Sequence, residues 1–191
     1  MHRHMRRLLA AAGTAAAVLA TAPLASAATQ ENAAGVGVLA RPAFKLPFDC
    51  GQSWRGSNWN GHSPAHSIDF NHYDANGTPD DFGRRVFASA GGTVLSSYYA
   101  TDTGYGNTIV IGHGDGWQTR YAHLSARDVK AGDTVAVGQQ IGKVGKSSAL
   151  YDLSPHLHYE QIHNGSVVVS VLQGVTWNDF LARYQTSTNR C

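Results

Sequence analysis

The sequence predicts an all-β domain, a small antiparallel β-sandwich or barrel-like sheet with a short C-terminal helix. From residue 67 onward, short segments that alternate apolar and polar residues follow one another closely, as in antiparallel sandwiches and barrels. Asp115-Gly116 and Asn164-Gly165 each separate two such segments, and these dipeptides favour tight hairpin turns. No helical period longer than two turns occurs before residue 177.

Residues 1–27 have the three parts of a secretory signal peptide. A basic start precedes an apolar run over residues 8–24, and Ala25-Ser26-Ala27 forms a cleavage site of small residues. Gly13 and Pro23 interrupt the apolar run, so we expect no stable membrane span after the signal is removed. The chain is therefore predicted to be secreted.

The remaining chain divides into a short linker and one domain. Residues 28–42 show no period and few bulky side chains, which indicates a linker or a short pro-segment. Residues 43–191 are enough for one domain with its own core. Residues 177–184 are predicted to form the short helix, with Thr176 as its N-cap. The predicted strands are residues 67–70, 86–88, 92–96, 107–111, 117–123, 134–136, 140–144, 156–160 and 167–169.

The two cysteines, Cys50 and Cys191, lie near the two ends of the predicted domain. In an oxidising compartment such a pair is expected to form a disulfide. In the chain-entropy model a loop of this length contributes at most about 5 kcal/mol to the free energy of unfolding. Two unpaired thiols are the alternative.

Charge excludes two classes of partner. Without the signal peptide, Lys and Arg fall from 15 to 12 because Arg3, Arg6 and Arg7 are lost, whereas all 13 acidic residues remain. A net charge near −1 (12 minus 13) favours neither a nucleic-acid nor an anionic-membrane partner. We expect the mature chain to be a monomer.

The predicted strand 156–160 places His156, His158 and Glu160 on one face and Leu157 and Tyr159 on the other. At about 3.3 Å per residue, the two imidazoles start roughly 6.6 Å apart. This spacing suits one histidine on a metal ion and the other on a group that the metal holds. A strand with two exposed polar residues is the alternative.

A second group of histidines surrounds Asp69, whose neighbours in sequence are apolar and are expected to face the core. His66 precedes Asp69 by three residues, so in a regular strand it points to the opposite face. Pro64 interrupts the strand and lets the chain fold back, which brings in His62. We therefore favour His62 over His66, and a zinc site of His62, Asp69 and one imidazole of the His-x-His strand. Three protein ligands with an open fourth position are typical of a catalytic zinc site.

Four other histidines carry less information. Tyr121 and His123 are expected to share a face of the predicted strand 117–123, where His123 taken alone is more often an exposed polar residue. His113 and His163 lie at predicted hairpin tips and His72 at the predicted surface, so no chemistry is expected of them.

Several segments together resemble the lysostaphin-type (LytM-like) zinc metallopeptidases that act on bacterial cell walls. The resemblance runs from about residue 61 to residue 162, with its motifs in order and at the usual spacing. The motifs are Gly104-Tyr105-Gly106-Asn107-Thr108, Tyr121-Ala122-His123-Leu124-Ser125, Gly132-Asp133-Thr134-Val135, Gly138-Gln139-Gln140-Ile141-Gly142 and Pro155-His156-Leu157-His158-Tyr159-Glu160.

This resemblance implies a secreted zinc metalloendopeptidase that hydrolyses peptide bonds of peptidoglycan stems or cross-bridges through a zinc-activated water. By position, it implies one Zn²⁺ per chain held by His62, Asp69 and His158. His123 and His156 are the implied catalytic residues, acting on the water and on the charge that develops at the attacked carbonyl. The implied partner is a bacterial cell-wall peptide, and the implied location is extracellular or associated with the wall.

The sequence departs from the family pattern at the first ligand. Many members have His-x-x-x-Asp, whereas the longer interval from His62 to Asp69 resembles members with an insertion between these ligands. Some relatives have lost ligands and are not enzymes. A non-catalytic peptidoglycan-binding module of the same fold is therefore the alternative function.

Overall fold

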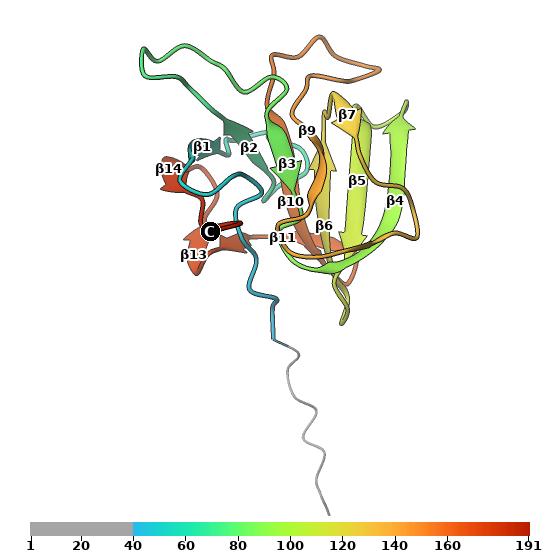
Figure 1. Cartoon of the computed structure of the whole chain (residues 1–191). Helices are drawn as coiled ribbons and strands as arrows, with labels where there is room; N and C mark the ends of the chain where they lie inside the picture. The colour runs from blue at the N-terminus through green and yellow to red at the C-terminus, as the bar shows by residue number, and fades with distance from the viewer. Residues whose placement is uncertain (1–39) are drawn as a thin grey trace, which may run out of the picture. The chain divides into compact units, whose positions relative to one another are not determined.

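A computed structural model of the chain describes residues 40–191 (Figure 1). The predicted signal peptide, residues 1–27, and most of the predicted linker, residues 28–42, lie outside the described residues. Within residues 40–191 every regular element is a β-strand, so this part of the chain has no helix that could span a membrane. The all-β prediction is confirmed.

Nine strands form one large antiparallel sheet in the order β14-β1-β2-β10-β6-β5-β4-β8, with β11 paired to β10. Their bounds are β1 Ser53–Ser57, β2 Ile68–Asn71, β4 Gly92–Ala100, β5 Gly106–Gly112, β6 Trp117–Ala122, β8 Thr134–Val135, β10 Leu157–His163, β11 Ser166–Val168 and β14 Ala182–Thr186. The hairpins expected at Asp115-Gly116 and Asn164-Gly165 join β5 to β6 and β10 to β11. All four turn residues have positive φ, which Asn, Asp and Gly tolerate best.

A second, three-stranded sheet packs against the first (Figure 1). It has the order β3-β9-β7, and β12 and β13 form a separate pair. The bounds are β3 Arg85–Phe87, β7 Ala126–Arg127, β9 Gln140–Lys143, β12 Ser170–Leu172 and β13 Val175–Trp177. The buried core draws on both sheets, with Ile109, Tyr121 and Tyr159 from the large sheet and Val86 and Ile141 from the small one. The architecture is therefore a sandwich.

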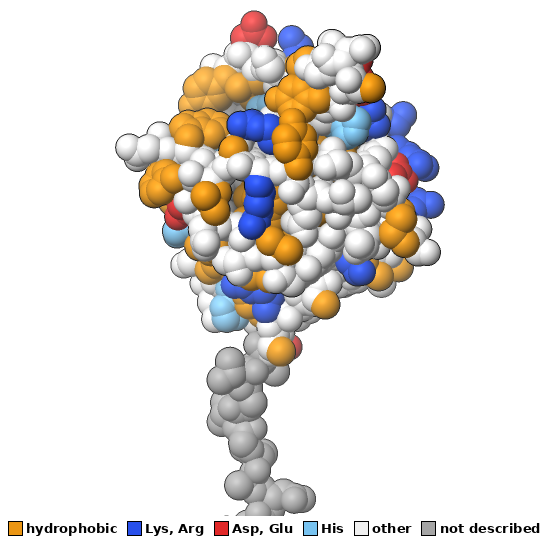
Figure 2. Space-filling view, turned by 90° about the vertical axis from the view of Figure 1, so that its left-hand side faces the viewer, with side chains coloured by type: hydrophobic (Ala, Val, Ile, Leu, Met, Phe, Trp, Pro, Cys, Tyr) orange, Lys and Arg blue, Asp and Glu red, His pale blue; other side chains and the backbone are white. Residues whose placement is uncertain are grey.

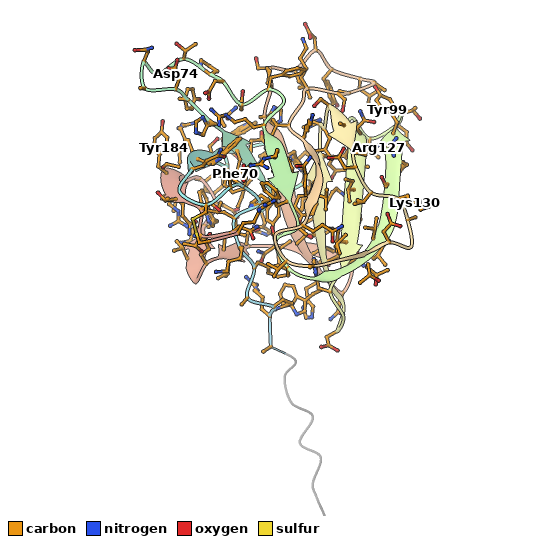
Figure 3. The ribbon with its side chains drawn as sticks, viewed as in Figure 1. Phe70, Asp74, Tyr99, Arg127, Lys130 and Tyr184 are labelled. Atoms are coloured by element: carbon orange, nitrogen blue, oxygen red, sulfur yellow. A yellow bond between two sulfur atoms is a disulfide. The ribbon has the colours of Figure 1, made fainter. Side chains whose placement is uncertain are left out.

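The register of the large sheet fixes which side chains meet on its outer face. Asp69 of β2 lies directly opposite His158 of β10. The residues on either side of Asp69 point into the core, as Phe70 does in Figure 3, and Leu157 and Tyr159 of β10 are also buried there. Because side chains alternate along a strand, Asp69 and His158 share the face turned away from the small sheet.

The predicted C-terminal helix is wrong. Residues 182–186 form β14, which pairs with β1, and Phe180 has a φ of 60° that a helix does not allow. The segment alternates between exposed and half-buried residues along β14, with the period of a strand. Arg183 lies over the Trp177 ring, and Gln185 accepts a hydrogen bond from the Trp177 indole. Pairing with the open edge of β1 thus overrides a short helical pattern.

The predicted disulfide between Cys50 and Cys191 is confirmed. It joins residues next to β1 and β14, and side chains between these elements add hydrogen bonds. Ser187 Oγ donates to Phe48 O at 2.7 Å, and Asn189 Nδ2 donates to Leu46 O at 3.0 Å. The side of the molecule that carries β14 has several separate groups of hydrophobic side chains with Lys and Arg between them (Figure 2).

Candidate metal centre

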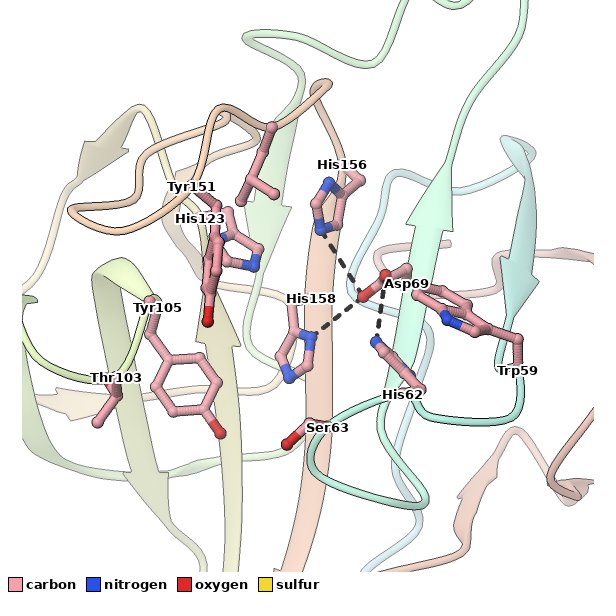
Figure 4. A pocket seen from close by; sticks show the side chains of 12 residues that line it. Trp59, His62, Ser63, Asp69, Thr103, Tyr105, His123, Tyr151, His156 and His158 are labelled. Carbon is pink, nitrogen blue, oxygen red and sulfur yellow. Dashed lines mark hydrogen bonds and ion pairs between the residues drawn. The ribbon is translucent and has the colours of Figure 1, made fainter.

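A cleft of about 240 Å³ lies on the outer face of the large sheet, over β2 and β10 (Figure 4). Two loops, residues 103–105 and 151–153, border one side, and the loop that carries Trp59 and His62 borders the other. The complete lining is Trp59, His62, Ser63, Asp69, Thr103, Gly104, Tyr105, His123, Tyr151, Leu153, His156 and His158. All five residues that the sequence proposed for the site are therefore in one place.

His62, Asp69 and His158 form the floor of this cleft. Asp69 Oδ2 lies 3.2 Å from His62 Nε2, and Asp69 Oδ1 lies 3.1 Å from His158 Nδ1 (Figure 4). One donor atom from each residue lies within 4.8 Å of the other two. Ligand atoms about 2.0–2.2 Å from a tetrahedral zinc are roughly 3.4 Å apart. The three side chains and their nitrogen and oxygen donors therefore fit a zinc ion after small rotations.

The loop before β2 directs the His62 side chain into the cleft and places the His66 side chain outside it. His62 Nδ1 lies 3.2 Å from the carbonyl oxygen of Ser67, and its ring stacks on Trp59 with centroids 4.1 Å apart. These contacts leave Nε2 directed at Asp69. His66 has a φ of 69°, and its Nδ1 lies 2.7 Å from Asp179 Oδ2, outside the cleft. The geometry therefore favours His62, as we expected from Pro64.

The ionisation of Asp69 and that of His158 depend on each other. Burial alone would raise the pKa of Asp69, but hydrogen bonds with His158 and His62 outweigh it and hold this pKa far below its usual range. Burial alone would lower the pKa of His158, but hydrogen bonds with Asp69 and Glu160 outweigh it and raise the pKa to about 9. Without a metal ion the cluster is therefore an ionised carboxylate hydrogen-bonded to a protonated imidazole.

His123 and His156 lie side by side next to the cluster, with ring centroids 4.7 Å apart. The expectation that Tyr121 and His123 share a face is wrong. β6 ends at Ala122, and His123 has a φ of 60°, so its side chain turns into the cleft while Tyr121 stays in the core. Alternation applies only inside a regular strand, and β6 ends one residue before His123.

Each of these two histidines donates one ring N–H to the backbone. His123 Nδ1 lies 3.0 Å from Ser147 O, and His156 Nδ1 lies 2.8 Å from Ser154 O. A carbonyl oxygen only accepts, so Nδ1 carries the proton and Nε2 is left to act in the cleft. Burial, together with the neighbouring His156 and His158, lowers the pKa of His123 to about 4. His123 is therefore a neutral base at neutral pH.

Sequence reasoning missed the residues that support the cluster. Glu160 had been placed on the face of His158 without a role, yet its fully buried carboxylate lies 3.0 Å from His158 Nε2. Tyr105 donates to Glu160 at 2.6 Å, and Arg120 lies opposite Glu160 on β6. Burial and the charge of Glu160 raise the pKa of Tyr105, so the hydroxyl keeps its proton. The available signal was the i, i+2 spacing of His158 and Glu160.

The remaining histidines differ from expectation because they pack against aromatic rings. The His113 ring lies against Phe44, with centroids 5.1 Å apart. Its Nδ1 is hydrogen-bonded to Gly91 O and its Nε2 to Thr119 Oγ1. His163 stacks on Trp117 at 4.2 Å. His72 contacts Asp80 and the edge of Trp54, so it is half-buried rather than a surface residue. These contacts are structural and lie outside the cleft.

The chain shares segments with proteins of bacterial cell walls and cell division. The peptidoglycan DD-endopeptidase ShyA of Vibrio cholerae serotype O1 is 42% identical over 89 residues, which are 45% of this chain and 19% of that protein. The cell division protein DipM of Caulobacter vibrioides is 38% identical over 78 residues, which are 41% of this chain and 12% of that protein. The match thus spans about a fifth or less of the length of these relatives.

The fold is similar to that of a solved zinc-containing peptidase from Vibrio cholerae, with a TM-score of 0.50 and 28% identity over 66% of this chain and 38% of that chain. Residues 74–170, which are 97 of the 191 residues, match peptidase family M23. This match includes His123, His156 and His158, and the sheet register brings Asp69 to the same cleft. The chain belongs to peptidase family M23, the family of the LytM-like peptidases.

Proposed function

We propose that this chain is an exported zinc metalloendopeptidase that hydrolyses peptide bonds in peptidoglycan stems or cross-bridges. The observation that carries the proposal is the placement of three metal-binding side chains and two further imidazoles in one cleft. His62, Asp69 and His158 are the proposed ligands of one zinc ion, and His123 and His156 are the proposed catalytic residues.

The chemistry divides between the metal and the two imidazoles. A bound zinc ion would lower the pKa of a water molecule toward ~7 and polarise the carbonyl of the scissile bond. His123 is neutral with Nε2 free, so it can accept a proton from the attacking water and later return one to the leaving amine. His156 presents Nε2 at the same cleft, and once this nitrogen has gained a proton its N–H would stabilise negative charge on the attacked oxygen.

The lining of the cleft supports cleavage inside a peptide. Among the residues that the structure describes, no Lys or Arg lines the cleft, and Asp69 is its one carboxylate. A carboxypeptidase, which removes a C-terminal residue, is expected to have a positive group next to the scissile bond to pair with the free carboxylate. Exposed Trp59 and Tyr151 instead form apolar walls suited to an uncharged stretch of substrate.

The wall substrate and the extracellular location are supported by the sequence. ShyA is named as a peptidoglycan endopeptidase, and this chain starts with the features of a signal peptide. A disulfide persists in an oxidising compartment, which agrees with export. We propose secretion to the cell exterior or the wall, with wall peptide as the partner.

The test uses oxidised protein comprising residues 28–191. We expect one zinc per chain and release of new amino groups from purified peptidoglycan, abolished by a chelator and restored by zinc. A His66→Ala variant is the matched control, because His66 lies in the same loop but outside the cluster. The proposal is overturned if no stoichiometric zinc binds, or if His158→Ala digests peptidoglycan as well as the parent.

The non-catalytic binding module gives a different result in the same assay. It would sediment with peptidoglycan and release no amino groups under any metal condition. The side chains argue against it, because every proposed catalytic role has an occupant with a directed ring nitrogen.

A further inference from the structure

The ligand His158 has a carboxylate on each side of its ring. Nδ1 lies 3.1 Å from Asp69 Oδ1, and Nε2 lies 3.0 Å from Glu160 Oε1. Glu160 has no exposed surface, whereas Asp69 borders the cleft. A metal ion in the cleft is therefore accessible to Nδ1 and not to Nε2.

Two side chains, Tyr105 and Arg120, hold the Glu160 carboxylate in place. Tyr105 donates to Oε1 at 2.6 Å, and Arg120 Nη1 lies 3.1 Å from Oε2. The Arg120 guanidinium also lies over the Tyr105 ring, with its carbon 4.5 Å from the ring centroid. Because Glu160 and Arg120 are direct partners in the β10–β6 register, the sheet itself sets this geometry.

Stability alone does not account for this arrangement. Removing the Glu160 carboxylate from water costs several kcal/mol, and apolar residues of similar volume are often as stable or more so. Arg120 Nε is buried without a hydrogen-bond partner, so the network is not fully satisfied. A buried carboxylate against one ring nitrogen of a ligand histidine is instead the arrangement that orients metal-binding imidazoles in zinc proteins.

We propose that Glu160, held by Arg120 and Tyr105, is a positioning residue that accepts the Nε2–H of His158 and so keeps the Nδ1 lone pair directed at the metal. This inference rests on the zinc site proposed above. It also assigns a second role to Tyr105, whose ring lines the cleft while its hydroxyl supports the ligand from behind.

The decisive variant is Glu160→Gln. A glutamine amide either turns its NH₂ toward His158, which favours the wrong tautomer, or turns it toward Arg120, which places two donors together. We expect zinc affinity, measured by competition with a chromophoric chelator, to fall about 10- to 100-fold.

Two further variants keep the test independent of folding. Thr119→Val removes another fully buried polar group, on neighbouring β6, that bonds to Tyr121 and His113 and not to the cluster. It should lower thermal stability without changing zinc affinity. Tyr105→Phe keeps the ring and removes one hydrogen bond to Glu160, and should weaken zinc binding about 2- to 10-fold.

The outcomes separate this inference from the proposed function. If the parent binds no zinc, the proposed function fails first. If the parent binds zinc and Glu160→Gln and Tyr105→Phe bind it equally well, Glu160 is only a structural residue. A ¹⁵N spectrum of the zinc-loaded parent supplies the direct readout: a protonated Nε2 on His158 supports the inference, and a protonated Nδ1 overturns it.

Discussion

The residues matched to family M23 and the residues that flank them contribute to the site in different ways. The matched segment, residues 74–170, supplies His158 from within β10, His123 from just after β6 and His156 from just before β10. The flanks, residues 40–73 and 171–191, supply His62 and Asp69. The site is therefore complete only where β2 pairs with β10, at the boundary between the two regions.

The two regions also hold their ligands differently. His158 is fixed on both ring nitrogens by carboxylates, inside a sheet with neighbours on both sides. His62 is held on a loop by the Ser67 carbonyl and by Trp59, whose ring is half exposed. The flank strands β1 and β14 depend on each other and on the disulfide. The matched segment thus supplies both proposed catalytic histidines and one proposed ligand. The other two proposed ligands come from the flanks.

Removing a ligand from either region should have the largest effect. We expect His158→Ala and His62→Ala both to reduce zinc affinity by more than the roughly 100-fold that loss of a supporting group costs, and to reduce hydrolysis to background. Zinc content after dialysis and amino-group release would check this. Retention of full activity in His62→Ala, together with its loss in His66→Ala, would reverse our assignment in the flank.

A change confined to the matched segment should separate binding from catalysis. His123→Ala should keep one zinc per chain and lose about 10²- to 10⁴-fold in kcat, because the proton acceptor is gone while the ligands remain. Metal analysis and steady-state rates on the same preparation test this. Loss of zinc in this variant would mean that His123 belongs to the ligand set.

A change confined to the flanks should act on stability first. Replacing both Cys50 and Cys191 by Ala should lower the free energy of unfolding by up to about 5 kcal/mol, because the loop that the disulfide closes spans 141 residues. Denaturant titration measures the loss. At concentrations where the variant remains folded, its kcat should equal that of the parent, and a lower kcat there would show that the disulfide shapes the cleft.

The smallest effect should come from pH. In the metal-free protein the pKa of His158 is about 9, above its unfolded value of about 6.5. Its proton therefore stabilises the metal-free fold fully below pH 6.5, and this contribution is lost as pH rises to 9. Zinc must displace the same proton, so zinc affinity should fall about tenfold for each unit below pH 9. Affinity that is constant between pH 7 and 8.5 would contradict this coupling.

The two regions were also unequal in what the sequence could predict. The matched segment has strong hairpin dipeptides and a His-x-His strand whose alternation holds, so its hairpins and the face of His158 follow from local pattern. His123 was placed in the site only by the family resemblance. Asp69 and His62 were found by parity and by Pro64, although only pairing with β10 brings them to His158. That pairing joins residues 89 positions apart, so local pattern could not predict it.

The errors have a common physical cause. The C-terminal helix was predicted from a short periodic segment, but residues 182–186, which overlap this segment, pair with the distant strand β1 instead. The face of His123 was predicted from alternation, which ended at Ala122. The role of Glu160 depends on Tyr105 and Arg120, which are 55 and 40 residues away in sequence. Local patterns contain no information about such contacts.

The pairing of β2 with β10 also sets when the metal site can exist. During synthesis Asp69 emerges long before His158, and β1 has no outer neighbour until β14 follows. In small zinc domains the ion organises a chain that is unfolded without it. Here the proposed ligands His62 and Asp69 meet the proposed ligand His158 only where β2 pairs with β10. We therefore expect zinc binding to follow formation of the large sheet.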